Sequence, residues 1–372
     1  MRLTRRDILK AGALTAGAAA LPRAAAADPI YAPSPDAWRT FEVVTRVEVA
    51  KPGRSIQAWL PIPAHADAAW VKPGANTWTT NAAAAHLAAA GAARPSGSEA
   101  DLLHVVWKEG EPAPVVELTS RIATRDRGTD LARPTGSSAL DAAERARSLK
   151  ATELLPTDGI VRETAERATA GATSDLDKVR ALYAWVIEHA HRDPKTVGCG
   201  LGDIASMLKT GALSGKCADL NALFVGLARS VGVPARDIYG LRIGPSRFGY
   251  KSLGPSNPVV TKAQHCRAEA FLDGFGWVAV DPADVRKVVL EEPPGQLALA
   301  DPKVAATRQA LLGSAEGNWL AFNTLHDVEL PGSSGPRLPF LMYPQLEVDG
   351  VRIDCYTPDL FRYAITAREI AS

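Results

Sequence analysis

Four segments in the first third of the chain read as β-strands, the clearest by an alternation of apolar and polar residues with the period of two that a half-buried strand shows. In the clearest, residues 41–50, alternate positions would share one face: Phe41, Val43, Thr45, Val47 and Val49. Similar runs follow at residues 55–63, 102–107 and 115–124. The pattern predicts a small antiparallel β-domain over residues 28–137. The alanine-rich residues 82–93 are left unassigned, because alanine favours a helix but turn residues follow it closely.

The second third of the chain changes to apolar residues that recur every three to four positions, as in amphipathic helices. We expect helices over residues 138–150 and 158–170, and a third that begins after the N-cap residue Ser174. The strongest signal is at residues 217–231, where apolar residues fall at i, i+3, i+4, i+7 and i+8: Leu220, Leu223, Phe224, Leu227 and Ala228. This pattern predicts a buried helix that ends at Gly232.

Strand signals return after this helix, at residues 237–243, 265–272 and 277–281. Asp273-Gly274 joins the last two as a hairpin-type turn. Two further strand-like runs lie in the tail, at residues 351–356 and 361–366. The order of elements predicts an α+β fold, with a core and its helical lead-in over residues 138–310 and a β-rich C-terminal extension over residues 311–372.

The N-terminus resembles an export signal. Residues 4–10 (TRRDILK) are similar to the twin-arginine pattern, with Ile8 in place of the usual Phe. The apolar stretch at residues 11–21 is too short and too rich in Ala and Gly to span a bilayer well, and small residues suited to a signal peptidase follow it. We therefore expect residues 1–27 to be a signal peptide and the mature chain to be periplasmic or secreted, without a membrane span. The alternatives are an uncleaved anchor and an N-terminus that is basic by chance.

The composition is that of a globular protein and argues against a nucleic-acid partner. Hydrophobic residues make up 46% of the chain and charged residues 22%, with a net charge of +1. The first 27 residues hold five basic residues and one acidic residue, so the remainder has a net charge near −3. Nucleic-acid-binding proteins usually carry a basic surplus on one face. The four cysteines are too few for a disulfide scaffold: Cys199, Cys217, Cys266 and Cys355.

Three residues of the predicted core have the types and positions of a nucleophile, a base and an orienting acid. Cys217 begins the buried helix, where unpaired N–H groups and the helix dipole favour a thiolate. His265 begins one strand of the predicted hairpin, and Asp281 ends the other. A hairpin brings such positions side by side, so the Asp281 carboxylate can accept a hydrogen bond from the imidazole. The arrangement predicts a thiol enzyme.

The segments around these residues resemble the transglutaminase-like superfamily. Residues 215–224 (GKCADLNALF) are similar to its cysteine helix, residues 264–269 (QHCRAE) to its histidine strand, and residues 276–282 (GWVAVDP) to its aspartate strand. The resemblance covers residues 174–290. It implies a papain-like α+β core with Cys-His-Asp chemistry, behind a β-domain like that of bacterial members. Where the superfamily often has an aromatic residue after the histidine, this chain has Cys266-Arg267, so the substrate channel is expected to differ.

The residues near the three candidates are expected to be structural. Asp219 and Asn221 would cap or charge the helix start, and Arg229 and Arg236 would form ion pairs within the fold. Cys266 adjoins His265 on a strand and would point to the opposite face. A Cys199–Cys266 disulfide is a hypothesis that rests only on the nearness of both to the site.

Neither a metal nor another cofactor is expected. A zinc site would need the three cysteines and the histidine to converge, but the chain has no C-x-x-C pair. It also lacks the Asp-x-Asp-x-Asp-Gly loop that would suggest calcium.

The leading hypothesis is an exported amidase or peptidase that acts on a peptide or protein through a Cys217 thioester. Transamidation of protein glutamine shares the first half-reaction and stays open, because the two outcomes differ in how well water is excluded. A non-catalytic module that binds a peptide or wall fragment is the alternative from another class. An acyl-CoA-dependent acetyltransferase is disfavoured, since an exported compartment lacks that cofactor. The sequence does not specify an oligomeric state.

Overall fold

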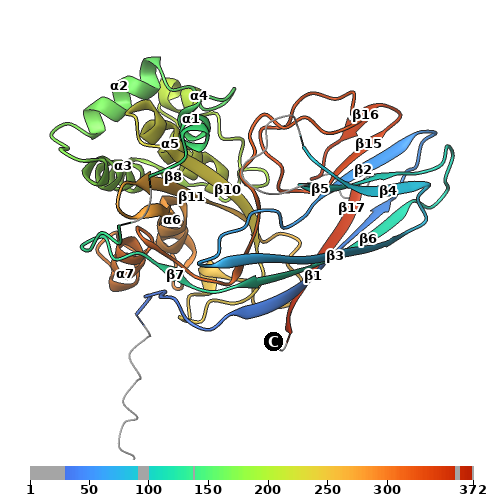
Figure 1. Ribbon diagram of the computed structural model, residues 1–372, viewed down its shortest axis with the longest axis horizontal. Coiled ribbons are helices and arrows are strands. Elements are labelled where there is room, and N and C mark those ends of the chain that lie inside the picture. Colours follow the sequence, from blue (N-terminus) through green and yellow to red (C-terminus); the bar gives the residue numbers. More distant parts are fainter. Residues whose placement is uncertain (1–29, 91–99, 137–138, 357–360, 371–372) are drawn as a thin grey trace, which may run out of the picture.

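The computed structural model describes residues 30–90, 100–136, 139–356 and 361–370. The predicted signal peptide at residues 1–27 lies outside these ranges, as does part of the alanine-rich segment. Figure 1 shows a helix-rich lobe beside an elongated lobe of strands. The fold is α+β, as predicted. Within the described residues, no helix is both long and apolar enough to cross a bilayer.

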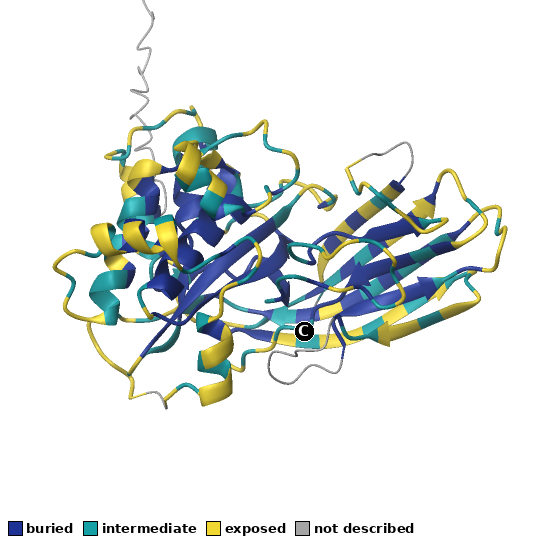
Figure 2. Ribbon diagram, turned by 90° about the horizontal axis from the view of Figure 1, so that it is seen from above, coloured by how far each residue is buried: buried dark blue, intermediate teal, exposed yellow. Residues whose placement is uncertain are grey.

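The elongated lobe is a sandwich of two antiparallel sheets with one apolar core between them. The first sheet has the order β17-β1-β6-β3, formed by Phe361–Ile370, Arg39–Val49, Val115–Thr124 and Val71–Thr80. The second has the order β16-β15-β2-β5-β4, formed by Val351–Ile353, Gln345–Val348, Ile56–Pro61, Leu102–Val106 and Ala84–Ala88. Along β1 the alternate residues predicted to share a face are the buried ones. Figure 2 shows buried positions alternating with more exposed ones along strands of this lobe. The period-two pattern therefore identified the inner face of this sheet correctly.

The C-terminal strands belong to the same two sheets as the N-terminal strands. β17 pairs with β1 along ten residues, and β15 pairs with β2. The two ends of the chain thus close the sandwich together, although the segment between them forms the other lobe (Figure 1). The boundaries predicted at residues 137/138 and 310/311 stay a prediction.

The helix-rich lobe is built on a four-stranded antiparallel sheet of order β12-β11-β10-β14. Its strands are Gly276–Val280, Gln264–Leu272, Ala235–Arg242 and Trp319–Asn323. Its helices are α1 (Ala142–Leu149), α2 (Gly159–Ala168), α3 (Asp175–His189), α4 (Ile204–Thr210), α5 (Cys217–Ser230), α6 (Pro282–Glu291) and α7 (Pro302–Ala310). A 3₁₀ turn at Lys251–Leu253 and four two-residue strands complete the described elements: β7 (Arg127–Gly128), β8 (His191–Arg192), β9 (Ser214–Gly215) and β13 (Ser314–Ala315).

Helix α5 is the centre of this lobe. Every residue of the helix is buried, and it packs against α2, α3 and α6 as well as against β10 and β11. A helix that is buried on all sides has no solvent-exposed face on which to place its polar residues. The inward polar residues of α5 must therefore find hydrogen-bond partners, and several of them do so at the candidate site.

Candidate active site

Cys217 is the first residue of α5 and is 4% exposed. The preceding loop is held to the helix by Asp219, whose carboxylate accepts hydrogen bonds from the backbone N–H groups of Lys216 (2.9 Å), Leu201 (3.0 Å) and Gly202 (2.9 Å). Asp219 thus has the structural role predicted for it. These bonds fix the loop that carries Cys199 against the helix start, where Ala218 N–H donates to the Cys199 carbonyl at 2.9 Å.

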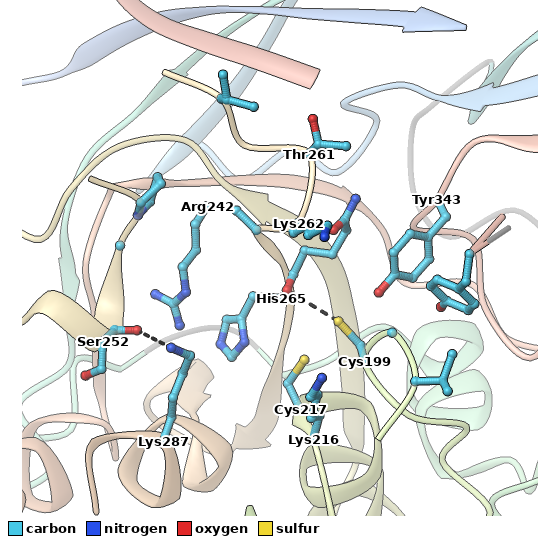
Figure 3. Close-up of a pocket in the computed structure, with 18 of the residues that line it drawn as sticks. Cys199, Lys216, Cys217, Arg242, Ser252, Thr261, Lys262, His265, Lys287 and Tyr343 are labelled. Carbon is cyan, nitrogen blue, oxygen red and sulfur yellow. Dashed lines mark hydrogen bonds between the residues drawn. The ribbon is translucent and has the colours of Figure 1, made fainter. Parts of the chain in front are cut away.

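His265 and Asp281 meet as the predicted hairpin requires. β11 and β12 are antiparallel, with Ala268 opposite Val280, so the register places Asp281 across from Arg267 and diagonally from His265. The His265 Nε2 to Asp281 Oδ2 distance is 2.8 Å, and both side chains are buried. This bond leaves Nδ1 of the ring for the Cys217 thiol. Figure 3 shows the ring and the thiol facing the same cavity.

Asp281 also caps the next helix. Its Oδ1 accepts a hydrogen bond from Asp284 N–H at 3.0 Å, and Pro282 occupies the first turn of α6, where its missing N–H costs nothing. The same oxygen accepts a 3.2 Å hydrogen bond from Asn221 Nδ2, on the first turn of α5. One carboxylate therefore links the histidine strand, the cysteine helix and α6.

A second carboxylate reaches the imidazole. Asp284 Oδ2 lies 3.4 Å from His265 Nε2, and Asp284 is itself paired with the buried guanidinium of Arg242. Burial opposes the charging of His265, but Asp284 and Asp281 outweigh it and raise its pKa to about 10. The histidine is therefore an imidazolium near neutral pH. His265, Asp281 and Asp284 are also close enough to hold a metal ion, but Arg242 already neutralises part of this cluster.

The Cys217 thiol lies among other sulfur groups. The neighbouring thiols of Cys199 and Cys266 are the largest causes that lower the pKa of Cys217 well below its ordinary value, and His265 adds to them. The Cys199 thiol also donates a hydrogen bond to the Gln264 carbonyl, at 3.3 Å. That Cys266 points to the face opposite His265 stays a prediction. All four cysteines are free, so the structure does not contain the hypothesised Cys199–Cys266 disulfide. A thiolate at Cys217 beside an imidazolium at His265 is the arrangement of an activated thiol.

The thiol and the imidazole open onto a cavity of about 890 Å³. It lies where the core sheet meets the C-terminal segment. Its walls include Cys199, Gln264 and Tyr343, together with residues of the loop before β11. Gln264 precedes His265, and its buried side-chain Nε2 has no hydrogen-bond partner among the residues that the structure describes. The volume is within the range of about 300 to 1,000 Å³ that small-molecule sites occupy.

The structure brings Cys217, His265 and Asp281 together, and their catalytic roles stay predictions. Asn221 was assigned only to the helix start, yet it donates to Asp281 and, at 2.8 Å, to the Cys266 carbonyl. Its spacing of four residues from Cys217, which places both on one helix face, was a usable signal. The ion pair expected of Arg236 is confirmed by its contact with Glu269, at 2.7 Å. Arg229 instead donates to the backbone carbonyls of Ala235 and Lys150, so it is structural but within the described residues has no ion-pair partner.

Comparisons with known proteins give one family match. Residues 162–282, from α2 to the start of α6, match the model of the transglutaminase-like superfamily. A protein of Haemophilus influenzae described as uncharacterised is 37% identical over 231 residues; the alignment covers 60% of this chain and 62% of the relative. The family match includes all three candidate residues and supports a thiol enzyme in general.

Two solved structures are similar at low scores. A candidate cysteine protease from Cytophaga hutchinsonii has 14% identity and a TM-score of 0.49, covering 90% of this chain and 99% of its own. The periplasmic domain of TgpA from Pseudomonas aeruginosa has 19% identity and a TM-score of 0.32, covering 68% and 88%.

Proposed function

From the premise that residues 162–282 are a transglutaminase-like core, we propose that this protein is an exported thiol hydrolase that cleaves an amide or peptide bond through a Cys217 thioester. The observation that carries the proposal is the His265 Nε2 to Asp281 Oδ2 hydrogen bond of 2.8 Å, beside a thiol at a helix N-terminus. Residues 1–27 resemble an export signal, and this resemblance supports a periplasmic or secreted location.

In the first half-reaction the Cys217 thiolate attacks the carbonyl carbon of the substrate. His265, which carries the proton, donates it from Nδ1 to the leaving amine as the tetrahedral intermediate collapses to the thioester. Asp281 holds the ring by Nε2, so that Nδ1 faces the thiol. In the second half-reaction His265 accepts a proton from water, which attacks the thioester and releases the acid.

We assign two N–H groups to the oxyanion. The first is the backbone N–H of Cys217 itself, at the positive end of α5. The second, in our proposal, is Nε2 of Gln264, a buried donor that lacks a partner on the wall of the same cavity. A buried donor left unbonded costs about 1–3 kcal/mol, and a bound oxyanion would recover this.

Hydrolysis is favoured over transamidation by the cavity around the thiol. The cavity is large, and exposed side chains such as Lys251 and Lys262 line it, so water has access to a thioester formed at Cys217. Transamidation would require water to be excluded until an amine arrives.

The test is the pH dependence of Cys217 alkylation by iodoacetamide, read by peptide mass spectrometry. An ordinary thiol titrates near about 8.5 and an activated one between about 3.5 and 7.5. We expect fast labelling at about pH 6 in the wild type, collapse of this rate in His265→Ala, and no change in His86→Ala, an exposed histidine of the sandwich. Labelling that rises only above about pH 8 in all three proteins would reject the thiol hydrolase and favour a binding module.

A further inference from the structure

The cavity beside Cys217 is strongly cationic, although the whole chain is nearly neutral, with a net charge of +1. One carboxylate, that of Glu291, is on its wall. Seven basic side chains line the same wall: Arg192, Lys216, Arg242, Lys251, Lys262, Lys287 and Arg362. Such an excess in a concave site focuses a positive potential into it.

Three of these cations are already compensated. Arg242 is paired with Asp284, and Arg192 and Lys287 share Glu291. The remaining four have no carboxylate within salt-bridge distance in the part of the chain that the structure describes: Lys216, Lys251, Lys262 and Arg362. Lys216 is half-buried, whereas the other three are exposed. We name these four residues the cationic rim.

The cationic rim lies close to the reacting groups. Lys216 directly precedes Cys217, and Lys262 is three residues before His265. Figure 3 shows Lys262 on the loop above the imidazole and Lys216 beside the thiol. Charges contributed by the residue before α5, by the segment before β11 and by β17 therefore line the cavity that holds the thiol.

Another part of the wall is aromatic and comes from the C-terminal segment: Tyr343, Tyr356, Phe361 and Tyr363. Tyr343 and Tyr356 pack edge to face, with ring centroids 5.1 Å apart. The cavity thus offers apolar surface and positive charge together, which suits a ligand that carries both carboxylates and apolar groups.

Building on the proposed function, we propose that the acyl donor is an acidic peptide with carboxylate groups close to the cleaved amide. The cationic rim binds these carboxylates and orients the carbonyl over Cys217, while the aromatic wall covers the neighbouring apolar part. Three of the four rim residues are lysines, which attract as compact point charges and accept carboxylates in varied geometry.

The first test compares two alkylating reagents that differ only in charge. Iodoacetate carries a carboxylate and iodoacetamide does not. The rate of Cys217 alkylation by iodoacetate, divided by the rate with iodoacetamide, therefore reports the local electrostatic potential. We expect this ratio to fall about fivefold or more in Lys251→Gln/Lys262→Gln, and to fall in the wild type as salt rises from about 0.05 to 0.5 M. Lys51→Gln/Lys108→Gln, which removes two exposed charges from turns of the sandwich, is the matched control and should keep the wild-type ratio. A ratio unchanged in the rim variant and by salt would overturn the proposal.

The second test does not need a reactive thiol. Tetraglutamate and tetraglutamine peptides with the same zwitterionic dye are titrated into Cys217→Ala, and binding is followed by fluorescence anisotropy. We expect the tetraglutamate peptide to bind more tightly by about tenfold or more, and Lys251→Gln/Lys262→Gln to remove the difference. Equal binding of the two peptides, or displacement of tetraglutamate by inorganic phosphate at the same concentration, would overturn the acidic-peptide proposal. If Cys217 is not activated in the alkylation experiment but the protein still prefers tetraglutamate, the proposed hydrolase is rejected and the acidic-peptide site is not.

Discussion

Asn221 Nδ2 donates a 3.2 Å hydrogen bond to Asp281 Oδ1, and this bond joins the helix that carries Cys217 to the carboxylate that orients His265. Asn221 is fully buried, and its Nδ2 also donates to the Cys266 carbonyl at 2.8 Å. Its Oδ1 in turn accepts from Ala283 N–H at 3.3 Å. One amide thus fixes α5, β11 and α6 relative to one another, and with them the positions of the three candidate residues.

Replacing Asn221 should therefore disturb both stability and the thiol. Asn221→Ala leaves a buried carbonyl and an amide without their partner, so we expect a loss of about 1–3 kcal/mol in the free energy of unfolding. Cys217 alkylation at about pH 6 should also slow, because Asp281 is less well held. Urea unfolding and peptide mass spectrometry measure the two effects. Wild-type stability together with a wild-type labelling rate would show that the bond to Asp281 has no influence.

Asp284 should set the upper limit of the pH range in which His265 is charged. Removing its carboxylate, 3.4 Å from Nε2, should lower the pKa of His265 from about 10. Imidazolium, which is complete below the folded pKa and lost above it, should then disappear at a lower pH. Asp284→Asn alone would leave the buried Arg242 guanidinium without its countercharge. The double variant Arg242→Gln/Asp284→Asn is therefore the better protein for this measurement. NMR titration of ¹⁵N-histidine, with His265→Ala for assignment, reads the pKa. Because Arg242 itself lowers the pKa of His265, Arg242→Gln is the reference, and the same pKa in this single variant and in the double variant would mean that Asp284 does not raise it.

Cys199 should contribute to the reactivity of Cys217 when its thiol proton, which bonds the Gln264 carbonyl at 3.3 Å, turns toward the thiolate. Its hydrogen bond is the largest cause that lowers the pKa of Cys217. Cys199→Ala should therefore raise that pKa and slow iodoacetamide labelling at about pH 6, whereas Cys199→Ser keeps a donor and should restore much of the rate. Cys355→Ala, which removes another free thiol from the cavity wall, is the control. Equal rates in the alanine and serine variants would exclude the hydrogen bond as the cause.

Local patterns predicted the elements that carry the candidate site. The periodicity of α5 placed Cys217 at a buried helix start, and the Asp273-Gly274 turn implied the hairpin that brings His265 to Asp281. Both features depend on residues within about 20 positions of one another, and such contacts leave a strong trace in the sequence. The Ser174 N-cap was predicted for the same reason, and its Oγ accepts from Asp177 N–H at 3.1 Å.

Elements without a clear period were missed. β3 contains Pro73-Gly74, which reads as a turn, and its pairing with β6 is irregular at that point. β14 is buried along its whole length and so has no alternation. The pairing of β17 with β1 joins residues more than 300 positions apart, and a local pattern holds no information on such a register. Likewise, Arg242 and Asp284 lie on elements that only the tertiary fold brings together.

Gln264 is expected to act on the transition state and not on the thiol. Gln264→Ala should lower kcat about 100- to 1,000-fold on a cleaved peptide, as loss of one oxyanion donor does elsewhere. Cys217 alkylation should keep its rate, because iodoacetamide forms no oxyanion. A peptide aldehyde, which gives a tetrahedral adduct with the thiol, should inhibit the variant more weakly. Unchanged aldehyde inhibition in a variant with normal alkylation would assign the second donor to another group.

Glu269 is a buried residue outside the site, and we expect it to stabilise the fold in a pH-dependent way. Its carboxylate is 1% exposed and lies between two guanidinium groups, those of Arg236, at 2.7 Å, and Arg127. Burial alone would raise the pKa of Glu269, but Arg236 and then Arg127 hold it at about 2. An unfolded glutamate titrates near about 4.3, so the stabilisation is complete above that pH and is lost as the pH falls toward about 2.

Glu269→Gln should therefore cost about 3–5 kcal/mol in the free energy of unfolding at neutral pH, because two buried guanidinium groups lose their countercharge. The difference from the wild type should shrink as the pH is lowered below about 4, where the unfolded wild-type glutamate takes up a proton. Urea unfolding between about pH 7 and 3.5 measures both. Glu109→Gln, which breaks an exposed pair with Arg54, should leave stability unchanged over the same range. A difference for Glu269→Gln that is constant with pH would show that the loss comes from packing and not from the charge.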